Sequence, residues 1–382
     1  SEIVITGDYF GPLDTDDSDI VVKYGPLSEQ DRYTATSCSM VTAQTKIICS
    51  TAPGVGANHK WHVQIGLQHS NILGSKTTKY IVPSINGLSG DAMAASGTTT
   101  YGGAAISISG TNFGPSSHTE VAAQYGPPGS TEKYTATGCA VISQTEITCV
   151  TAPGVGKDLR WSVTVGAQVS TVFTSDTTAY VVPEVTDLSG DAVISPSITE
   201  GGSEIVITGD YFGPLGVNSD IQAHYGPSGS PNKYTATNCA VSSSQTEIRC
   251  NTIPGVGSGL MWSVTVGGQG SGVLTSKTTR YANPTVSTLS GAAVDADGTA
   301  TTGGADIVLT GTNFGPANAG TSISVYYGPV SEPKKYDATA GCTVSLAHRR
   351  LTCKTVAGVG ANLKWQVEIE GQASIASSST TK

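Results

Sequence analysis

Residues 139–165 read CAVISQTEITCVTAPGVGKDLRWSVTV, and this stretch decides the fold. Apolar and polar residues alternate on both sides of the Pro153-Gly154 turn, as in short strands that bury one face. No window of the chain shows a sustained period of 3.6 residues, so helices are not expected. We therefore predict a hairpin that carries both cysteines, a turn, and a strand that begins at Trp161.

The same stretch occurs four times. Its tryptophan is found at Trp61, Trp161, Trp262 and Trp365, and the motif Pro-Gly-Val-Gly begins at Pro53, Pro153 and Pro254 and becomes Ala-Gly-Val-Gly at Ala357. A Tyr-Gly-Pro turn begins at Tyr24, Tyr125, Tyr225 and Tyr327. The 382 residues are therefore four copies of a unit of roughly 100 residues, which is the size of an independent domain.

A longer period lies over the first. Residues 1–13 (SEIVITGDYFGPL) recur letter for letter at residues 203–215, whereas the other two copies share GTNFGP at 110–115 and 311–316. The order of the copies is A-B-A-B. Proline-led stretches open the later copies, namely PSINGLSG from Pro83, PEVTDLSG from Pro183 and PTVSTLSG from Pro284, and each predicts one short strand.

These boundaries predict four domains. They span residues 1–82, 83–182, 183–283 and 284–382; the first lacks the opening strand and the last lacks the end of its closing strand. The second copy suggests about seven short strands near 106–109, 121–125, 139–141, 147–149, 161–165 and 181–182, with one more after Pro83. Such spacing favours an all-β sandwich, and four of them arranged end to end.

Composition excludes several classes of protein. Charged residues make up 13% of the chain and the net charge is −9, which opposes nucleic-acid binding. No apolar run is long enough to insert into a membrane. The sequence opens at Ser1 without Met or a signal segment, so we expect a processed protein, a window from a longer array, or a subunit that shares an edge with its neighbour.

The cysteines come two per copy, 10 or 11 residues apart. They are Cys38 and Cys49, Cys139 and Cys149, Cys239 and Cys250, and Cys342 and Cys353. In the second copy both thiols share a face with inward residues on neighbouring strands, which predicts a disulfide in each copy and an oxidising compartment, most simply the cell exterior. Buried reduced thiols are the alternative; zinc fits poorly because no copy supplies third and fourth ligands at regular positions.

Taken together, G-x-N-F-G-P, Y-G-P, C-x-V…I-x-C-x-T-x-P-G-x-G and W-x-V-x-V-G resemble the IPT/TIG immunoglobulin-like domain. The resemblance covers all four copies, with Ala357 and Met40 as departures from the pattern. It implies four tandem immunoglobulin-like β-sandwiches of the IPT/TIG type and a role at a cell surface. It implies no catalytic activity. We expect Trp61, Trp161, Trp262 and Trp365 to be core residues, each buried against the disulfide of its own copy or the strands that carry it.

Chemical sites are few. His59, His62 and His69 cluster only in the first copy, but His62 alternates with inward Trp61 and should face solvent rather than a metal. Asp14, Asp16, Asp17 and Asp19 form the one acidic loop and are a weak calcium candidate; Asp295 and Asp297 are weaker. No constellation for catalysis assembles, so we expect neither an enzyme nor a cofactor. Ser/Thr-rich stretches at 96–100, 299–302 and 377–381 are candidates for O-linked glycans.

Three functions compete. The first is a structural extracellular protein that builds a fibre or surface appendage by head-to-tail association, its partners being copies of itself or further repeats of the same chain. The second is the ectodomain of a receptor or adhesin that binds a protein or glycan ligand. A Rel-like DNA-binding module is third, and both the net charge of −9 and the eight cysteines oppose it.

Overall fold

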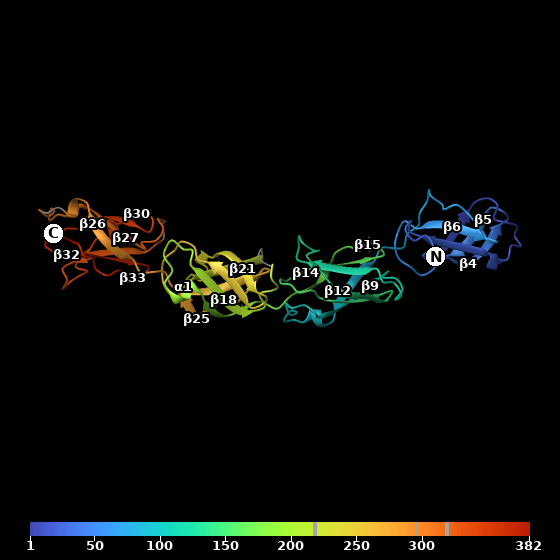
Figure 1. Ribbon diagram of the computed structural model, residues 1–382, viewed down its shortest axis with the longest axis horizontal. Coiled ribbons are helices and arrows are strands. Elements are labelled where there is room, and N and C mark those ends of the chain that lie inside the picture. Colours follow the sequence, from blue (N-terminus) through green and yellow to red (C-terminus); the bar gives the residue numbers. More distant parts are fainter. Residues whose placement is uncertain (217–219, 295–296, 318–320) are drawn as a thin grey trace. The chain divides into compact units, whose positions relative to one another are not determined.

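The computed structural model describes residues 1–216, 220–294, 297–317 and 321–382. The chain divides into two compact units, Ser1–Val181 and Val182–Lys382. This division falls one residue before the predicted boundary between the second and third copies. Figure 1 labels strands of both units. We refer to the four copies as repeats 1 to 4, with the limits predicted above; that finer division remains a prediction.

The first unit holds repeats 1 and 2. The strands of repeat 1 are β1 (Glu2–Thr6), β2 (Ile20–Gly25), β3 (Tyr33–Thr34), β4 (Thr36–Thr42), β5 (Lys46–Ser50), β6 (Lys60–Ile65) and β7 (Gln68–His69), with a 3-10 turn at Asp17–Asp19. Those of repeat 2 are β8 (Ser84–Ser89), β9 (Ala105–Thr111), β10 (Val121–Gly126), β11 (Tyr134–Thr135), β12 (Thr137–Ser143), β13 (Glu146–Val150), β14 (Leu159–Val165), β15 (Gln168–Val169) and β16 (Phe173–Thr178), with a 3-10 turn at Asp91–Met93.

The second unit holds repeats 3 and 4. The elements of repeat 3 are β17 (Glu184–Ser189), the short helix α1 (Asp191–Ile194), β18 (Glu204–Asp210), β19 (Ile221–Gly226), β20 (Tyr234–Thr235), β21 (Thr237–Ser243), β22 (Glu247–Asn251), β23 (Leu260–Val266), β24 (Gln269–Gly270) and β25 (Leu274–Thr279). Those of repeat 4 are β26 (Thr285–Ser290), β27 (Asp306–Thr312), β28 (Ile323–Gly328), β29 (Tyr336–Asp337), β30 (Thr343–Leu346), β31 (Arg350–Lys354), β32 (Leu363–Ile369), β33 (Gln372–Ala373) and β34 (Thr380–Thr381), with 3-10 turns at Ala292–Val294 and Thr339–Gly341.

Each repeat contains two antiparallel sheets. In repeat 2 one sheet has the order β12-β13-β9-β8, and the other has the order β11-β10-β14-β15 with β16 also paired to β14. Inward residues of both sheets, among them Ile108 of β9 and Trp161 of β14, form one buried cluster. The alternation of apolar and polar residues therefore builds a β-sandwich, as predicted, because each strand supplies one face to a shared core.

Repeat 1 has fewer strands. Within residues 1–181, all of which the structure describes, its first sheet is β1-β5-β4 and its second is β3-β2-β6-β7. Repeats 2, 3 and 4 add β8, β17 and β26 to the edge of the first sheet, and β16, β25 and β34 to the second. One edge of β1 therefore carries no paired strand among the described residues.

The expected strand at Val181-Val182 is wrong. The closing strand of repeat 2 is β16, and the chain then makes a single bridge at Tyr180 and leaves the sheet. The FTSDTT sequence of β16 does not alternate apolar and polar residues, and Phe173 is its one apolar contact with the core. A strand is predicted from the apolar residues that alternate along its buried face, and β16 lacks that alternation.

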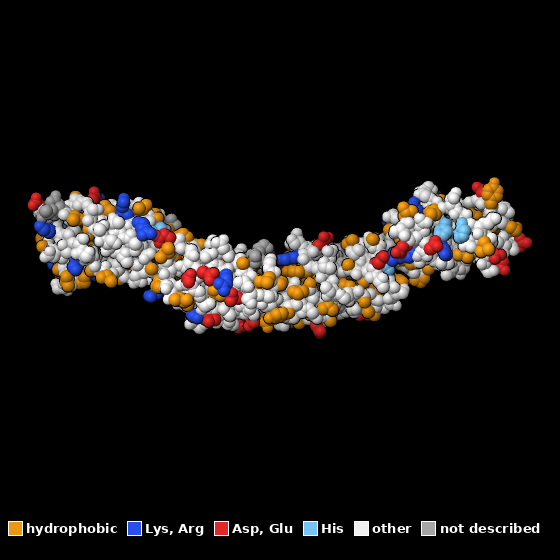
Figure 2. All heavy atoms as spheres, in the orientation of Figure 1, with side chains coloured by type: hydrophobic (Ala, Val, Ile, Leu, Met, Phe, Trp, Pro, Cys, Tyr) orange, Lys and Arg blue, Asp and Glu red, His pale blue; other side chains and the backbone are white. Residues whose placement is uncertain are grey.

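The surface is sparsely charged. On the face shown in Figure 2, charged side chains are scattered singly or in small groups among uncharged atoms. Among the described residues there is no helix with the length and apolar character that crossing a membrane requires.

Candidate functional site

The eight cysteines form four disulfides, each within one repeat. The pairs are Cys38–Cys49, Cys139–Cys149, Cys239–Cys250 and Cys342–Cys353. In repeat 2 the bridge joins β12 to β13, the two arms of the predicted hairpin. The four tryptophans are buried, at 0% exposure except for Trp61 at 4%. Each donates its indole N–H to a threonine hydroxyl and stacks on the tyrosine of the Tyr-Gly-Pro turn, as Trp61 does with Thr78 and Tyr24.

The predicted acidic loop does not form a ligand set. Asp16 accepts hydrogen bonds from the backbone and hydroxyl of Ser18, which lower its pKa. Among the described residues no three His, Cys, Asp or Glu side chains converge to hold a metal ion, so Asp14, Asp17 and Asp19 are not gathered around a cation. Asp295 lies outside the described residues.

The histidines of repeat 1 differ from the expectation. His62 does not simply face solvent: its side chain is 14% exposed and its Nε2 lies 3.1 Å from Asp31. His69 is exposed on β7. His59 is buried at 1% exposure, and its ring lies 5.4–5.9 Å from those of Tyr24, Tyr33 and Tyr80. Burial lowers the pKa of His59.

The Ser/Thr-rich stretches are partly buried. Thr98 and Thr100 in the first, and Ser377 and Thr381 in the third, are at most 4% exposed. Their hydroxyls are therefore not accessible to a glycosyltransferase in the folded chain. Ser96, Thr301 and Thr302 are exposed.

The same geometry joins the two repeats inside each unit, and the sequence patterns described above do not predict it. In the first unit, Val55 of the Pro-Gly-Val-Gly loop inserts into repeat 2 and belongs to its hydrophobic core. It lies against Gly114 and Gly166, where a Cβ atom would collide with the Val55 side chain. The loop is fixed from behind, because the Tyr33 hydroxyl both donates to the Val55 carbonyl and accepts from its N–H.

A glutamine closes this joint. The Oε1 of Gln168 accepts from Gly56 N at 3.1 Å, and its Nε2 donates to Tyr80 O at 3.1 Å. An ion pair of 2.8 Å between Arg32 and Glu120 lies beside it and lowers the pKa of Glu120. The joint therefore has three parts. Val55, here called the knob, fills a socket beside Gly114 and Gly166; Gln168 forms two hydrogen bonds to the backbone of repeat 1; and Arg32 and Glu120 form a charge pair.

The second unit builds the same joint between repeats 3 and 4. Val256 belongs to the core of repeat 4 and lies against Gly315. Gln372 donates from Nε2 to Tyr281 O at 2.8 Å, and Lys233 pairs with Glu370 at 3.3 Å. The glutamine recurs at Gln68, Gln168, Gln269 and Gln372, so an alignment of the four repeats would have revealed it.

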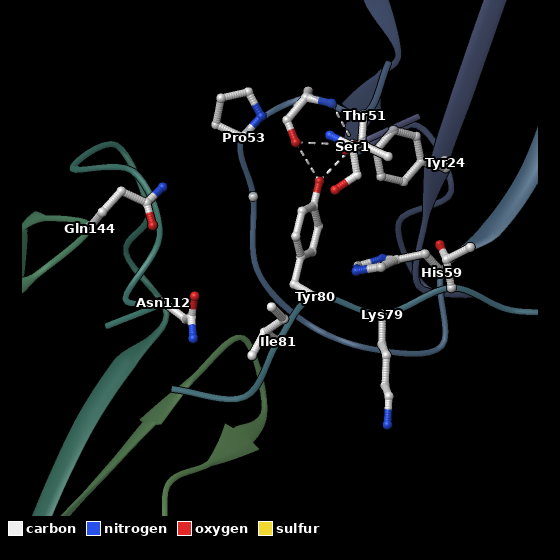
Figure 3. Close-up of a pocket in the computed structure, with 13 residues that line it drawn as sticks. Ser1, Tyr24, Thr51, Pro53, His59, Lys79, Tyr80, Ile81, Asn112 and Gln144 are labelled. Atoms are coloured by element: carbon white, nitrogen blue, oxygen red, sulfur yellow. Dashed lines mark hydrogen bonds between the residues drawn. The ribbon is translucent and has the colours of Figure 1, made fainter. Parts of the chain in front are cut away.

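A pocket of about 380 Å³ lies beside the joint of the first unit (Figure 3). Repeat 1 contributes Ser1, Thr51, His59 and Tyr80, and repeat 2 contributes Asn112 and Gln144. The Tyr80 hydroxyl donates to Ala52 O at 2.6 Å and contacts the Tyr24 hydroxyl, and burial raises the Tyr80 pKa above its ordinary value. The Tyr80 hydroxyl in the pocket wall is therefore held in position by its hydrogen bonds to Ala52 and Tyr24.

A groove of about 660 Å³ runs along the open edge of β1. Its floor is formed by Ile3, Ile5 and Trp61, and Leu73 and Lys76 lie on the facing segment. Its lining combines these side chains with the edge of β1 that has no paired strand among the described residues.

Comparisons with known proteins agree with this architecture. A sequence model of the IPT/TIG domain matches residues 93–180 and 192–281, within repeats 2 and 3. No curated protein sequence matches the chain.

Solved structures resemble the chain as a whole only at low identity. The full extracellular region of plexin A4 is 13% identical, with 96% of this chain and 34% of that chain covered and a TM-score of 0.23. The FN1–FN3 domains of chicken CNTN1 are 9% identical, with 78% and 97% covered and a TM-score of 0.25. Invasin, a bacterial integrin-binding protein, is 11% identical, with 96% and 76% covered and a TM-score of 0.20. The chain spans about a third of the plexin region that it matches.

The two matched segments coincide with disulfide-bonded sandwiches, and repeats 1 and 4 share the tryptophan, the turn tyrosine and the cysteine pair of those sandwiches. Residues 93–180 and 192–281 are therefore IPT/TIG domains, within a chain that is a tandem array of immunoglobulin-like β-sandwiches.

Proposed function

We propose that this chain is a structural extracellular protein that associates head to tail into a fibre. Four disulfides favour an oxidising environment, such as the cell exterior. The proposal rests on one observation. Val55 and Val256 are 3% exposed because each fills the socket of the next repeat, whereas their counterpart in repeat 4, Val359, is 66% exposed.

The exposed knob of repeat 4, Val359, has the same backbone support as the buried knobs. Tyr336 fixes the backbone of Val359 through two hydrogen bonds, as Tyr33 fixes Val55. The matching socket in repeat 1 is open as well: Gln68 is exposed, and a Cβ at Gly66 would meet nothing within 4 Å. Repeat 4 of one copy can therefore dock on repeat 1 of the next by the joint already used inside each unit. Such a contact does not close on itself and so propagates into a filament.

The test is assembly of the oxidised chain, followed by sedimentation velocity and negative-stain microscopy at increasing concentration. We expect polymers that lengthen with concentration. Val359→Asp should leave the chain monomeric, because it places a charge in the apolar socket. Ile375→Asp is the matched control: Ile375 is 90% exposed in the same repeat and lies outside the knob, so that variant should polymerise normally.

Monomeric rods at all concentrations would contradict the proposal, and so would polymers that Val359→Asp leaves intact. Either result would favour an isolated receptor or adhesin ectodomain.

A further inference from the structure

We infer that repeat 1 is an acceptor for one extended peptide, which has the pattern of residues 183–202. The pattern is Pro-x-Val-x-x-Leu-Ser-Gly, a short turn, and then Thr-x-Gly-Gly. The inference deepens the proposed function, because it names the segment that completes the repeat at the docking end. Every segment of this pattern within the chain is already seated in its own repeat, as β8, β17 and β26 show.

The strongest argument is an internal control. Residues 1–13 and 203–215 are identical, yet Val4 is 44% exposed while Val206 is 6% exposed. Ile3 and Ile5 are only half-buried, whereas Ile205 and Ile207 are 0% exposed. The difference lies in β17, which pairs antiparallel with β18. The same sequence in β1 has no such strand, so its apolar side chains line the groove.

The identity of the two segments fixes the register of the incoming strand. In repeat 3, Leu188 lies opposite Ile207, and Ser189 lies opposite Val206. The equivalent positions of repeat 1 are Ile5 and Val4. A leucine of the incoming strand should therefore lie opposite Ile5 and fill the groove above Trp61.

Charge on the facing wall also matches this ligand. Lys277 pairs with Asp187 of β17 at 2.8 Å, and its counterpart in repeat 1 is Lys76, which lines the groove. A leucine on the same segment also lacks a contact in repeat 1, because Leu73 is 44% exposed whereas its counterpart in repeat 3, Leu274, is 9% exposed. Both walls of the groove therefore lack the partner that β17 provides in repeat 3.

The polar pocket takes the second half of the same peptide. In repeat 3 the carbonyl of Thr199 accepts from Gly255 N, and its N–H and hydroxyl contact Asn313 and His348 of the next repeat. The counterparts of the last two, Asn112 and Gln144, line the pocket of Figure 3.

Backbone groups in this pocket are also unpaired. Ser197 bridges the backbone on both sides of Tyr281, by accepting from Ala282 N and donating to Arg280 O. In repeat 1 the corresponding groups are Ile81 N and Lys79 O, and together with Gly54 N they form no hydrogen bond within the described residues. We therefore expect Ile81 N, Lys79 O and Gly54 N to form hydrogen bonds with the Ser-x-Thr part of the peptide.

The probe is a synthetic peptide of residues 183–202, added to the oxidised full-length chain. Its binding is followed by fluorescence anisotropy of the labelled peptide, and the site is mapped by hydrogen exchange. We expect 1:1 binding and slower exchange of the amides of residues 2–6 and of residues 54 and 81. A peptide with Leu188→Asp should bind at least about tenfold more weakly, because it would bury a charge against Ile5 and Trp61.

A charge exchange isolates the register. Lys76→Glu in the chain should weaken binding of the natural peptide by about two- to fivefold, as expected for an exposed ion pair, and the Asp187→Lys peptide should recover that loss. Lys354→Glu is the matched control, because Lys354 is an exposed lysine of repeat 4 that lines neither the β1 groove nor the polar pocket. Absent protection of residues 2–6, or binding that is indifferent to both Leu188→Asp and Lys76→Glu, would overturn the inference. Chains that pair with one another through β1 and exclude the peptide would also overturn it, since the occupant would then be a second copy.

The two proposals fail separately. Val359→Asp should abolish polymers and leave peptide binding unchanged. A wild-type chain that binds the peptide but never polymerises refutes the fibre and retains the acceptor site; polymers without peptide binding do the reverse.

Discussion

His59 occupies the position that leucine holds in the other repeats, at Leu159, Leu260 and Leu363. Its burial among three tyrosine rings lowers its pKa below the ordinary value of 6.5. In the unfolded chain the same imidazole binds a proton near pH 6.5, so below that pH the unfolded state holds more protons than the folded state. Repeat 1 should therefore lose stability as the pH falls below about 6.5, and keep it above.

The variant His59→Leu tests this directly. We expect repeat 1 to become more stable at pH 7.5 and to lose most of its sensitivity to acid, since a residue that the other repeats use replaces a buried polar ring. Hydrogen exchange of the β6 amides at pH 7.5 and pH 5, corrected for intrinsic rates, measures both effects. The β23 amides of repeat 3 provide the control, because Leu260 occupies this position there. An unchanged acid response in β6 would assign the sensitivity to another group; His118, whose pKa is also lowered by burial, is the next candidate.

The tryptophans are the largest buried side chains of the repeats. Trp262→Ala should destabilise repeat 3 by about 3–5 kcal/mol, because it leaves a cavity and frees Thr279 from the indole N–H. Denaturant unfolding followed by hydrogen exchange of β19 and β23 would measure the loss. Trp262→Phe, which retains most of the apolar volume, should cost clearly less. A loss below about 1 kcal/mol for the alanine variant would show that the indole contributes little to the core.

Among the elements, β15 carries the clamp of the first joint through Gln168. Gln168→Ala removes bonds to the backbone of both Gly56 and Tyr80 and should weaken the joint between repeats 1 and 2 by about 1–3 kcal/mol. Faster hydrogen exchange of the hydrogen-bonded amides of residues 55, 56 and 80, with β9 and β13 unaffected, is the expected signature. The same substitution at Gln68, which is exposed, should leave exchange in the monomer unchanged and weaken only polymer formation. Equal effects of the two variants on the monomer would contradict the proposed role of the glutamine.

How far the sequence predicts these elements depends on what each strand buries. β9, β13 and β14 alternate apolar and polar residues, so their positions and the cysteine pairing follow from the pattern. β16 contributes only Phe173 to the apolar core, and its sequence FTSDTT does not alternate, so it has no such signal. The joint was not foreseen because Val55 lies in a loop, and its burial depends on a surface supplied by the next repeat.

The candidate site could be predicted only in part. The missing opening strand of repeat 1 follows from comparing the copies. The groove does not, because its walls include Leu73 and Lys76, in a segment where the sequence shows no strand pattern. The burial of His59 also escapes prediction from its own neighbours, since its partners come from three separate segments.

At the scale of the whole molecule, the proposed joint between copies includes one charge pair. Arg32 of the first joint corresponds to Lys335 in repeat 4, and Glu120 corresponds to Asp19 in repeat 1. Lys335→Glu should therefore weaken polymer formation by about two- to fivefold per contact, and adding Asp19→Lys in the same chain should restore it. The critical concentration measured by sedimentation reports both changes. Failure of the second substitution to rescue the first would exclude this pairing of the two ends.

The four hairpin disulfides have a mechanical consequence. Each closes a loop across a sequence separation of 10 or 11 residues, and that loop cannot be drawn out when the chain is pulled. At about 3.5 Å per extended residue, a pulled repeat yields roughly 35 Å less length than its residue count allows. Single-molecule stretching should therefore show four unfolding steps that each lengthen by that amount once the bridges are reduced. An oxidised fibre of such repeats would be a tether of restricted extensibility, whose maximum length is set by the redox state of its surroundings.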